Sequence, residues 1–149
     1  MLKGFEELTT DIKTSIRITM GIINTLFGSS DKNSKKKESF VNWIPLTSVE
    51  QLNEIEKLSE KEPIAIFKHS TRCGISSMVI KRFENSFDES LKNLKVYYLD
   101  LLNYRDISNE VGYKFQVHHQ SPQLLIIKNK EAVAHASHYE IARIDLKSF

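Results

Sequence analysis

The stretch IAIFKHSTRCGISS, residues 64–77, joins an apolar run to a polar turn and then to the one cysteine of the chain. Ile64–Phe67 has the length and composition of a buried strand, and Ser70–Arg72 reads as a turn. Four apolar residues then recur at intervals of four and predict one face of a helix: Ile75, Val79, Phe83 and Phe87. A strand that passes through a turn into a helix places Cys73 at the helix N-terminus.

Upstream of this stretch, the sequence predicts a short strand and a helix. Trp43–Leu46 suggests the strand. Thr47 and Glu50 have the spacing of a capping box, which predicts a helix to about Glu60. Pro63 then separates this helix from the buried strand.

Downstream, three strands and two helices are expected. Val96–Leu102 is rich in β-branched and aromatic residues, and Asn103 can cap a helix whose inner face is Ile107, Val111 and Phe115. Leu124–Ile127 and Ala132–Ala136 are close enough to form an antiparallel hairpin. Ser137 and Glu140 form a second capping box, which predicts a final helix to Phe149. This order predicts an α/β sandwich of three layers around a central mixed sheet.

The first 40 residues differ from the rest and are expected to be an extension of a domain that spans residues 41–149. Apolar residues at spacings of three and four over residues 2–27 predict an amphipathic helix, and residues 28–39 read as a charged linker. This helix could contact a membrane surface, but the favoured interpretation is that it packs on the domain or on a partner, or that the extension is not translated.

Charge and cysteine content limit the classes of function. Residues 1–40 carry seven basic and five acidic side chains, whereas residues 41–149 carry fourteen of each. A neutral domain without a basic stripe gives no electrostatic footprint for nucleic acid. A single cysteine cannot form an internal disulfide, so we expect a reducing, cytoplasmic location.

Cys73 is the candidate nucleophile. The free amides at a helix N-terminus stabilise an anion, and the thiolate is the attacking species in disulfide exchange. Lys68, His69 and Arg72 precede it and can add positive potential. The alternative is a buried cysteine that only fills space, but the polar and small residues around Cys73 favour the reactive interpretation.

Ser76 occupies the place that the second cysteine holds in a Cys-x-x-Cys motif. A hydroxyl cannot resolve a mixed disulfide, so an outside thiol would have to do so. His69, His118 and His119 could approach Cys73 and hold a metal ion or share a cluster, but their spacing matches no metal signature, and we predict no metal and no tightly bound cofactor. Pro122 opens a strand, where proline marks an edge or a turn, sometimes with a cis peptide.

Three separated motifs resemble the YtxJ-type family of monothiol bacilliredoxin-like proteins. They are Phe67 to Ser76, His119 to Gln123, and Ala136 to His138. The resemblance covers residues from about 41 to the C-terminus. The short stretch Met20–Gly28 is also similar to the usual beginning of such proteins, which makes Met20 a candidate start of translation. The family often has proline after the cysteine, where this chain has Gly74, and glycine is less suited to the first helical turn. Glutaredoxin-coupled arsenate reductases share the Cys-Gly-x-Ser string, but their arginine pattern is not matched.

The resemblance implies a thioredoxin-like fold, a nucleophile at Cys73 and a cis peptide before Pro122 beside it. It also implies that the protein removes a small thiol, bacillithiol in this family, from protein mixed disulfides, with substrate bound by Ser121, Pro122 and Gln123. The residues alone leave two alternatives open: a thioredoxin-fold module that binds peptides with an inert cysteine, and a carrier of a metal or cluster. Nothing in the residue pattern distinguishes bacillithiol from glutathione or coenzyme A.

Overall fold

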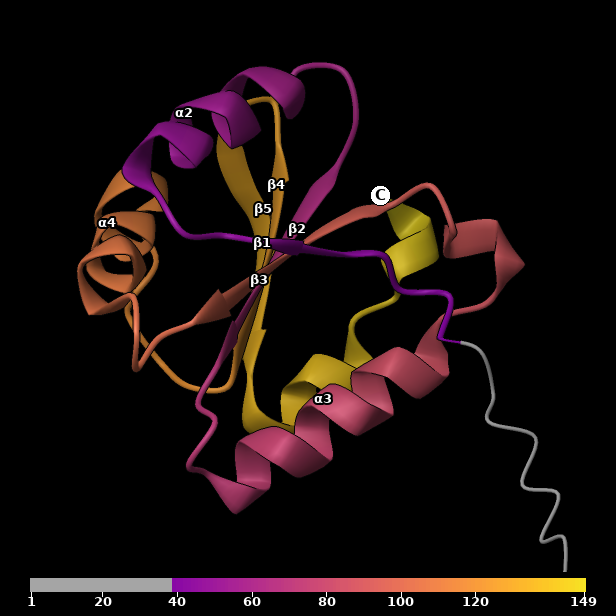
Figure 1. Cartoon of the computed structure of the whole chain (residues 1–149). Helices are drawn as coiled ribbons and strands as arrows, with labels where there is room; N and C mark the ends of the chain where they lie inside the picture. The colour runs from indigo at the N-terminus through magenta and orange to yellow at the C-terminus, as the bar shows by residue number, and fades with distance from the viewer. Residues whose placement is uncertain (1–38) are drawn as a thin grey trace, which may run out of the picture. The chain divides into compact units, whose positions relative to one another are not determined.

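A computed structural model describes residues 39–149, and the predicted N-terminal helix and all but the last residue of the predicted linker lie outside this range. The described chain forms a sheet with helices on both faces (Figure 1). The strands are β1 (Trp43–Pro45), β2 (Ile64–His69), β3 (Lys95–Asp100), β4 (Gln123–Lys128) and β5 (Glu131–Ser137). The α-helices are α2 (Val49–Leu58), α3 (Gly74–Ser86) and α4 (Arg105–Phe115), and 3₁₀ turns span Glu89–Leu91, His138–Arg143 and Leu146–Ser148.

The five strands form one mixed sheet in the order β1-β3-β2-β4-β5. β1, β3 and β2 run parallel, β4 is antiparallel to β2, and β5 is antiparallel to β4. β2 is therefore the central strand, and every one of its residues is buried. The apolar run that predicted a buried strand is explained by this position, because a central strand is covered on both faces.

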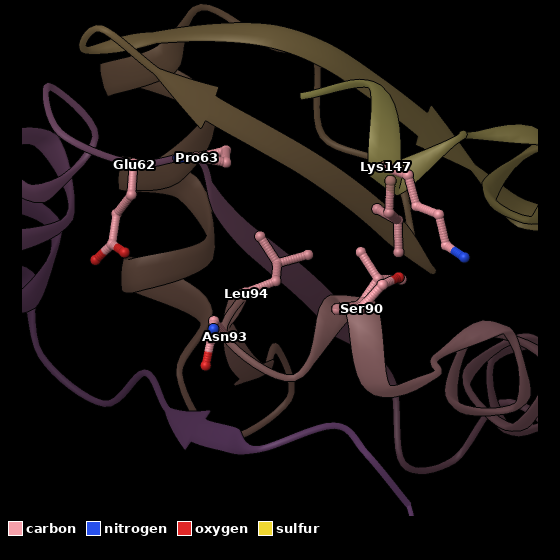
Figure 2. Close-up of a pocket in the computed structure, with 8 residues that line it drawn as sticks. Glu62, Pro63, Ser90, Asn93, Leu94 and Lys147 are labelled. Carbon is pink, nitrogen blue, oxygen red and sulfur yellow. The ribbon is translucent and has the colours of Figure 1, made fainter.

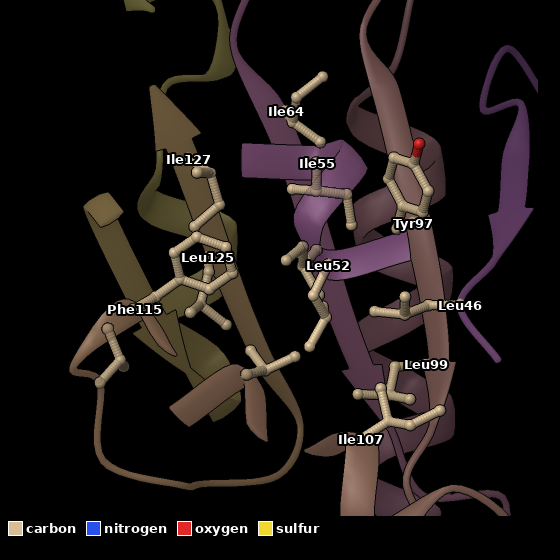
Figure 3. Close-up of a cluster of buried hydrophobic side chains, with 13 residues drawn as sticks. Leu46, Leu52, Ile55, Ile64, Tyr97, Leu99, Ile107, Phe115, Leu125 and Ile127 are labelled. Carbon is tan, nitrogen blue, oxygen red and sulfur yellow. The ribbon is translucent and has the colours of Figure 1, made fainter. Parts of the chain in front are cut away.

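Alternate residues of β2 support separate hydrophobic clusters on the two faces of the sheet, as the two-residue period of a strand requires. Ile64 and Ile66 pack with side chains from α2 and α4 (Figure 3). Ala65 and Phe67 pack on the other face with side chains from α3, including Val79. Lys68 and His69 continue this alternation, so the last two residues of β2 point to opposite faces.

The predicted capping residues were wrong at α2 and α4. At α2, Ser48 is the N-cap and Gln51 completes the capping box, one residue later than the predicted pair of Thr47 and Glu50. At α4, Tyr104 is the N-cap and makes no side-chain capping bond. Asn103 instead donates from its amide to Asp100 at 2.7 Å. Ser, Thr, Asn and Asp all bond readily to nearby backbone or side chains, so neighbouring candidates compete for the same role.

The predicted C-terminal helix is also wrong. Residues 138–143 and 146–148 form two 3₁₀ turns, and Ser137 makes no capping bond. Only a few apolar residues of this segment, including Ile141 and Leu146, reach the core. Short helical segments with little to bury are marginal as α-helices, which accounts for the broken turns.

α3 matches its predicted face with one exception. Val79 and Phe83 are buried, and Phe87 is buried as the residue that caps the helix C-terminus. Ile75 lies in the first turn and is 43% exposed, so it does not join the core. Within residues 39–149, none of the helices combines the length and apolar character that crossing a membrane would require.

Candidate active site

Cys73 is the N-cap residue of α3 and is partly exposed. Its backbone N–H donates to the Ser70 carbonyl at 3.2 Å, which closes the turn between β2 and α3. Its own carbonyl accepts the Ser77 N–H at 3.1 Å, the first bond of the helix. The predicted placement of the cysteine at the start of this helix is therefore confirmed, and the sulfur belongs to a residue beside unpaired helix amides.

Ser76 braces the turn that carries Cys73. Its side chain is fully buried, and its Oγ accepts the backbone N–H of Ser70 at 3.1 Å. The same Oγ lies 2.7 Å from His69 Nδ1. The residue in the place of a second cysteine is thus joined by hydrogen bonds to the end of β2 and to the turn, and it holds Cys73 in position relative to both.

His69 is the partner of Ser76 on the α3 face of the sheet. It is 7% exposed, and its ring lies 5.7 Å from that of Tyr98. Burial lowers the pKa of His69 below its usual value, against the opposing effect of Asp100 and Glu84. The neutral imidazole is therefore favoured, and in the tautomer with a proton on Nε2 the Ser76 hydroxyl donates to Nδ1.

Lys68 points to the opposite face of the sheet, toward α4. Its side chain is fully buried, and Nζ donates to the backbone carbonyl of Ser108 at 3.0 Å. Burial lowers the pKa of Lys68 from 10.5 to about 8. The hydroxyl of Ser108 lies 3.3 Å from His119 Nδ1, and burial with the nearby charges of Lys68 and Arg105 lowers the pKa of His119. The influence of Lys68 on Cys73 remains a prediction.

Arg72 and Gly74 flank the cysteine and are both exposed. Gly74 is the first residue of α3, and a Cβ added there would meet no atom within 4 Å. No described glycine has a positive φ, so the backbone does not require glycine at this position. The departure from the proline that the resemblance led us to expect is therefore not imposed by a steric need for glycine.

The Ser121–Pro122 peptide bond is cis, as the family resemblance implied. Pro122 directly precedes β4, and the next residue, Gln123, pairs with Lys68 of β2. This register places the start of β4 beside the end of β2, from which the turn to Cys73 begins. The Ser121 Oγ is buried and has no hydrogen-bond partner among the described residues.

Gln123 is 2% exposed and supports the cis-proline loop from within. Its Nε2 donates to the His118 carbonyl at 2.8 Å, and its Oε1 accepts the Gln120 N–H at 3.4 Å. Gln123 therefore orders the loop before Pro122. A direct contact of its side chain with substrate remains a prediction.

The histidines considered as metal ligands are not gathered around Cys73. His69 contacts Ser76 and His119 contacts Ser108, on opposite faces of the sheet. In residues 39–149, no group of three or more histidine, cysteine, aspartate or glutamate side chains is arranged to hold a metal ion.

A pocket of about 390 Å³ lies at the end of the sheet opposite to Cys73 (Figure 2). Pro63 and Leu94, which line it, directly precede β2 and β3, whereas Cys73 follows the end of β2. The amino ends of parallel strands lie at the edge opposite to their carboxyl ends, so this pocket is separate from the cysteine.

The sheet order, the cysteine at the start of α3 and the cis-proline before β4 define a thioredoxin-fold protein with one thiol. The family model described as "Monothiol bacilliredoxin BrxC" matches residues 44–146. The chain therefore belongs to the monothiol bacilliredoxin family, which makes it a member of a family of thioredoxin-fold thiol–disulfide oxidoreductases. This family membership implies substrates related to bacillithiol.

Solved structures show the same fold. A protein described as having a thioredoxin fold is 30% identical, with a TM-score of 0.57 over 66% of this chain and 85% of that chain. Thioredoxin from Trypanosoma brucei brucei is 19% identical, with a TM-score of 0.53 over 70% of this chain and 85% of that chain. Thioredoxin O2 from Arabidopsis thaliana is 19% identical, with a TM-score of 0.55 over 71% of this chain and 89% of that chain.

Three features of the site were not predicted from the sequence. These are the bond between Ser76 and His69, the burial of Lys68 against α4, and the left-handed backbone of His138 (φ 53°). The alternation along β2 was the available signal for the first two, since Lys68 and His69 continue a buried strand. Nothing local in the sequence indicated the conformation of His138.

Proposed function

We propose that this protein removes a small thiol, bacillithiol, from protein cysteines by taking it onto Cys73. Support comes from membership of the monothiol bacilliredoxin family and from the placement of the one cysteine of the chain at the N-terminus of α3. The observation that carries the proposal is the buried Ser76, which fills the position of a resolving thiol without supplying one. A reducing, cytoplasmic compartment suits such a chemistry.

The reaction has two exchange steps. In the first, the Cys73 thiolate attacks the small-thiol sulfur of the mixed disulfide. A new disulfide forms between Cys73 and the small thiol, and the protein cysteine leaves as a thiolate that takes a proton from solvent. In the second, the thiolate of a free small thiol attacks this disulfide, which regenerates Cys73 and releases a symmetric small-molecule disulfide. Electrons balance because each step exchanges one disulfide for another.

The segment around the cis-proline, Ser121 to Gln123, is the proposed substrate-binding surface. Ser121 and Pro122 precede β4 at the same end of the sheet as the turn to Cys73, so an extended protein segment could lie along them. Two exposed apolar side chains lie in the first turns of α3, Ile75 (43% exposed) and Met78 (45% exposed). A protein substrate, more than a free small molecule, would benefit from covering them.

The test is the intact mass of the chain, and of a Cys73→Ser variant, after mixing with a model protein that carries bacillithiol or glutathione on its single cysteine. The proposal predicts the gain of one small-thiol mass by the wild-type chain alone, with bacillithiol as the faster donor. Transfer to the Cys73→Ser variant, or to neither chain, would contradict it. Faster transfer from glutathione would keep the exchange chemistry and change the substrate.

A second function is favoured by the same exposed apolar side chains. Ile75 and Met78 could bind an extended peptide while Cys73 stays inert. Peptide binding that is unchanged in the Cys73→Ser variant, together with no mass transfer, would support this module in place of the enzyme.

A further inference from the structure

His138 has a backbone conformation that a residue with a side chain rarely adopts. It follows the last residue of β5 and has φ 53°, in the left-handed region. Residues with a Cβ are uncommon in this region, although histidine tolerates it better than most. Its backbone N–H donates to the Pro122 carbonyl at 3.0 Å, which holds it in place. Glycine would satisfy the same backbone without strain, so the side chain needs another explanation.

This backbone bond places His138 beside the cysteine end of the sheet. Pro122 precedes Gln123, whose pairing with Lys68 sets the start of β4 level with the end of β2. The next residue after His138 is Tyr139, and the guanidinium of Arg82 on α3 lies 5.8 Å from the centre of its ring. The segment that begins at His138 therefore contacts the cis-proline through the His138 backbone and the later part of α3 through Tyr139.

The imidazole of His138 is available for a ligand. The residue is exposed, and among residues 39–149 the structure gives its ring no hydrogen bond, ion pair or aromatic contact. At the same edge, the hydroxyl of Ser121 is buried without a hydrogen-bond partner. The nearby carboxylate of Glu140 lies 3.9 Å from Arg143, whose charge offsets it.

We propose that His138 is a specificity-determining residue that donates a hydrogen bond to a carboxylate of the small thiol while that thiol is bound to Cys73. This inference rests on the proposed function, since it assigns the recognition of the small thiol to a particular side chain. An imidazole carries at least one N–H donor in either charge state, and a bond from it to a carboxylate is charge-assisted. Bacillithiol bears carboxylates on its malyl group, whereas 2-mercaptoethanol bears none, so the two thiols separate this contact from the exchange chemistry.

The test compares transfer to Cys73 from a model protein that carries either bacillithiol or 2-mercaptoethanol. His138→Gly keeps the left-handed backbone and removes the imidazole, and His138→Asn keeps the backbone and returns an amide donor. For the bacillithiol donor, kcat/KM should fall about tenfold in His138→Gly and recover partly in His138→Asn, as expected for one charge-assisted hydrogen bond. For the 2-mercaptoethanol donor it should change less than about twofold in both variants. His135→Asn, at an exposed histidine of β5, is the matched control and should leave both donors unaffected.

An equal decrease of kcat/KM for the two donors in His138→Gly would show that His138 only shapes the backbone. An unchanged kcat/KM for both donors would show that His138 has no role. Both results overturn the inference and leave the proposed function intact. If the wild-type chain accepts neither donor, the proposed function fails, and a second measurement still decides the role of His138. Cys73 is then loaded chemically with each thiol, and the ring nitrogen resonances of the histidines are recorded by NMR. A shift of the His138 signals with bacillithiol but not with 2-mercaptoethanol supports the contact, and equal spectra overturn it.

Discussion

Replacing Lys68 with methionine removes a buried amine and leaves a flexible apolar side chain in the same space. The native amine is fully buried, makes one hydrogen bond to the Ser108 carbonyl, and has its pKa lowered by burial from 10.5 to about 8. A shift of this size corresponds to roughly 3 kcal/mol of lost stability at pH 7, because the buried ammonium group is solvated less well in the folded state than in water. Removing the buried charge would restore this stability, but losing the hydrogen bond to Ser108 costs roughly 1 kcal/mol. We therefore expect Lys68→Met to raise the free energy of unfolding by about 2 kcal/mol at pH 7.

The pH dependence gives the sign of this effect. Below about pH 8 the amine is protonated in both states, and the full cost of burying the charge is present. Between about pH 8 and pH 10.5 the folded protein has lost the proton while the unfolded chain still binds it, so stability rises with pH through this window. The advantage of Lys68→Met over the wild type should accordingly shrink as the pH increases from 7 to 10.

The assay is urea unfolding of both chains at pH 7 and pH 10, followed by circular dichroism. Lys61→Met, at an exposed lysine, is the matched control and should change stability by less than about 0.5 kcal/mol at either pH. Destabilisation by Lys68→Met at pH 7, or a difference from the wild type that is the same at pH 7 and pH 10, would refute the reasoning. The first result would mean that the bond to α4 outweighs the cost of the buried charge.

Three further predictions follow from the residues around the cysteine. Ser76→Ala removes both hydrogen bonds of the hydroxyl and leaves His69 buried without its partner. The free energy of unfolding in urea should therefore fall by about 1–3 kcal/mol. An unchanged unfolding midpoint would show that Ser76 does not stabilise the turn. Gly74→Pro places proline at the first helical position, where no hydrogen bond of the helix is lost. The melting temperature should rise by an amount that corresponds to about 0.4–1 kcal/mol in the free energy of unfolding. A lower melting temperature would show that the proline ring clashes with the turn. Because burial lowers the pKa of His69, the free energy of unfolding should fall as the pH drops below 6.5. In urea unfolding from pH 7 to pH 5, His69→Gln should reduce this dependence on pH. An equal dependence in both chains would mean that other groups cause it.

The central part of the fold could be predicted from the sequence because its signals are local and consistent. The apolar run before His69 indicated a buried strand, and the interval of four after Cys73 indicated a helix. Together they placed the cysteine at the start of α3, where the structure has it. Strand and helix periodicity report burial directly, and burial is what the sheet and its two helical layers impose.

The ends of elements were predicted less well, because several residues compete for each cap. Ser48 and Gln51, not Thr47 and Glu50, cap α2, and the sequence pattern allows both pairs. The C-terminal segment has the spacing of a capped helix but too few residues in the core to make one. Local spacing cannot report how much surface a segment buries.

The contacts within the site depend on tertiary structure, and the sequence could not show them. The hydrogen bond of the Lys68 side chain to α4 could not be foreseen, because only the strand alternation in the folded sheet decides which face Lys68 occupies. The expected effect of Lys68 on the potential near Cys73 stays a prediction. Ser76 was identified only by what it lacks, a thiol. Its bonds to His69 and Ser70 show that it also holds the turn in place.

The central claim is that Cys73 accepts the small thiol and that nothing within the chain removes it again. It is tested most directly by following the intact mass over time after mixing with a bacillithiol-carrying model protein and then removing that protein. The account predicts that the adduct of the wild-type chain persists until free bacillithiol is added, whereas a Ser76→Cys variant releases it unaided by forming an internal disulfide. Spontaneous loss of the adduct from the wild-type chain, or no adduct at all, would contradict the account.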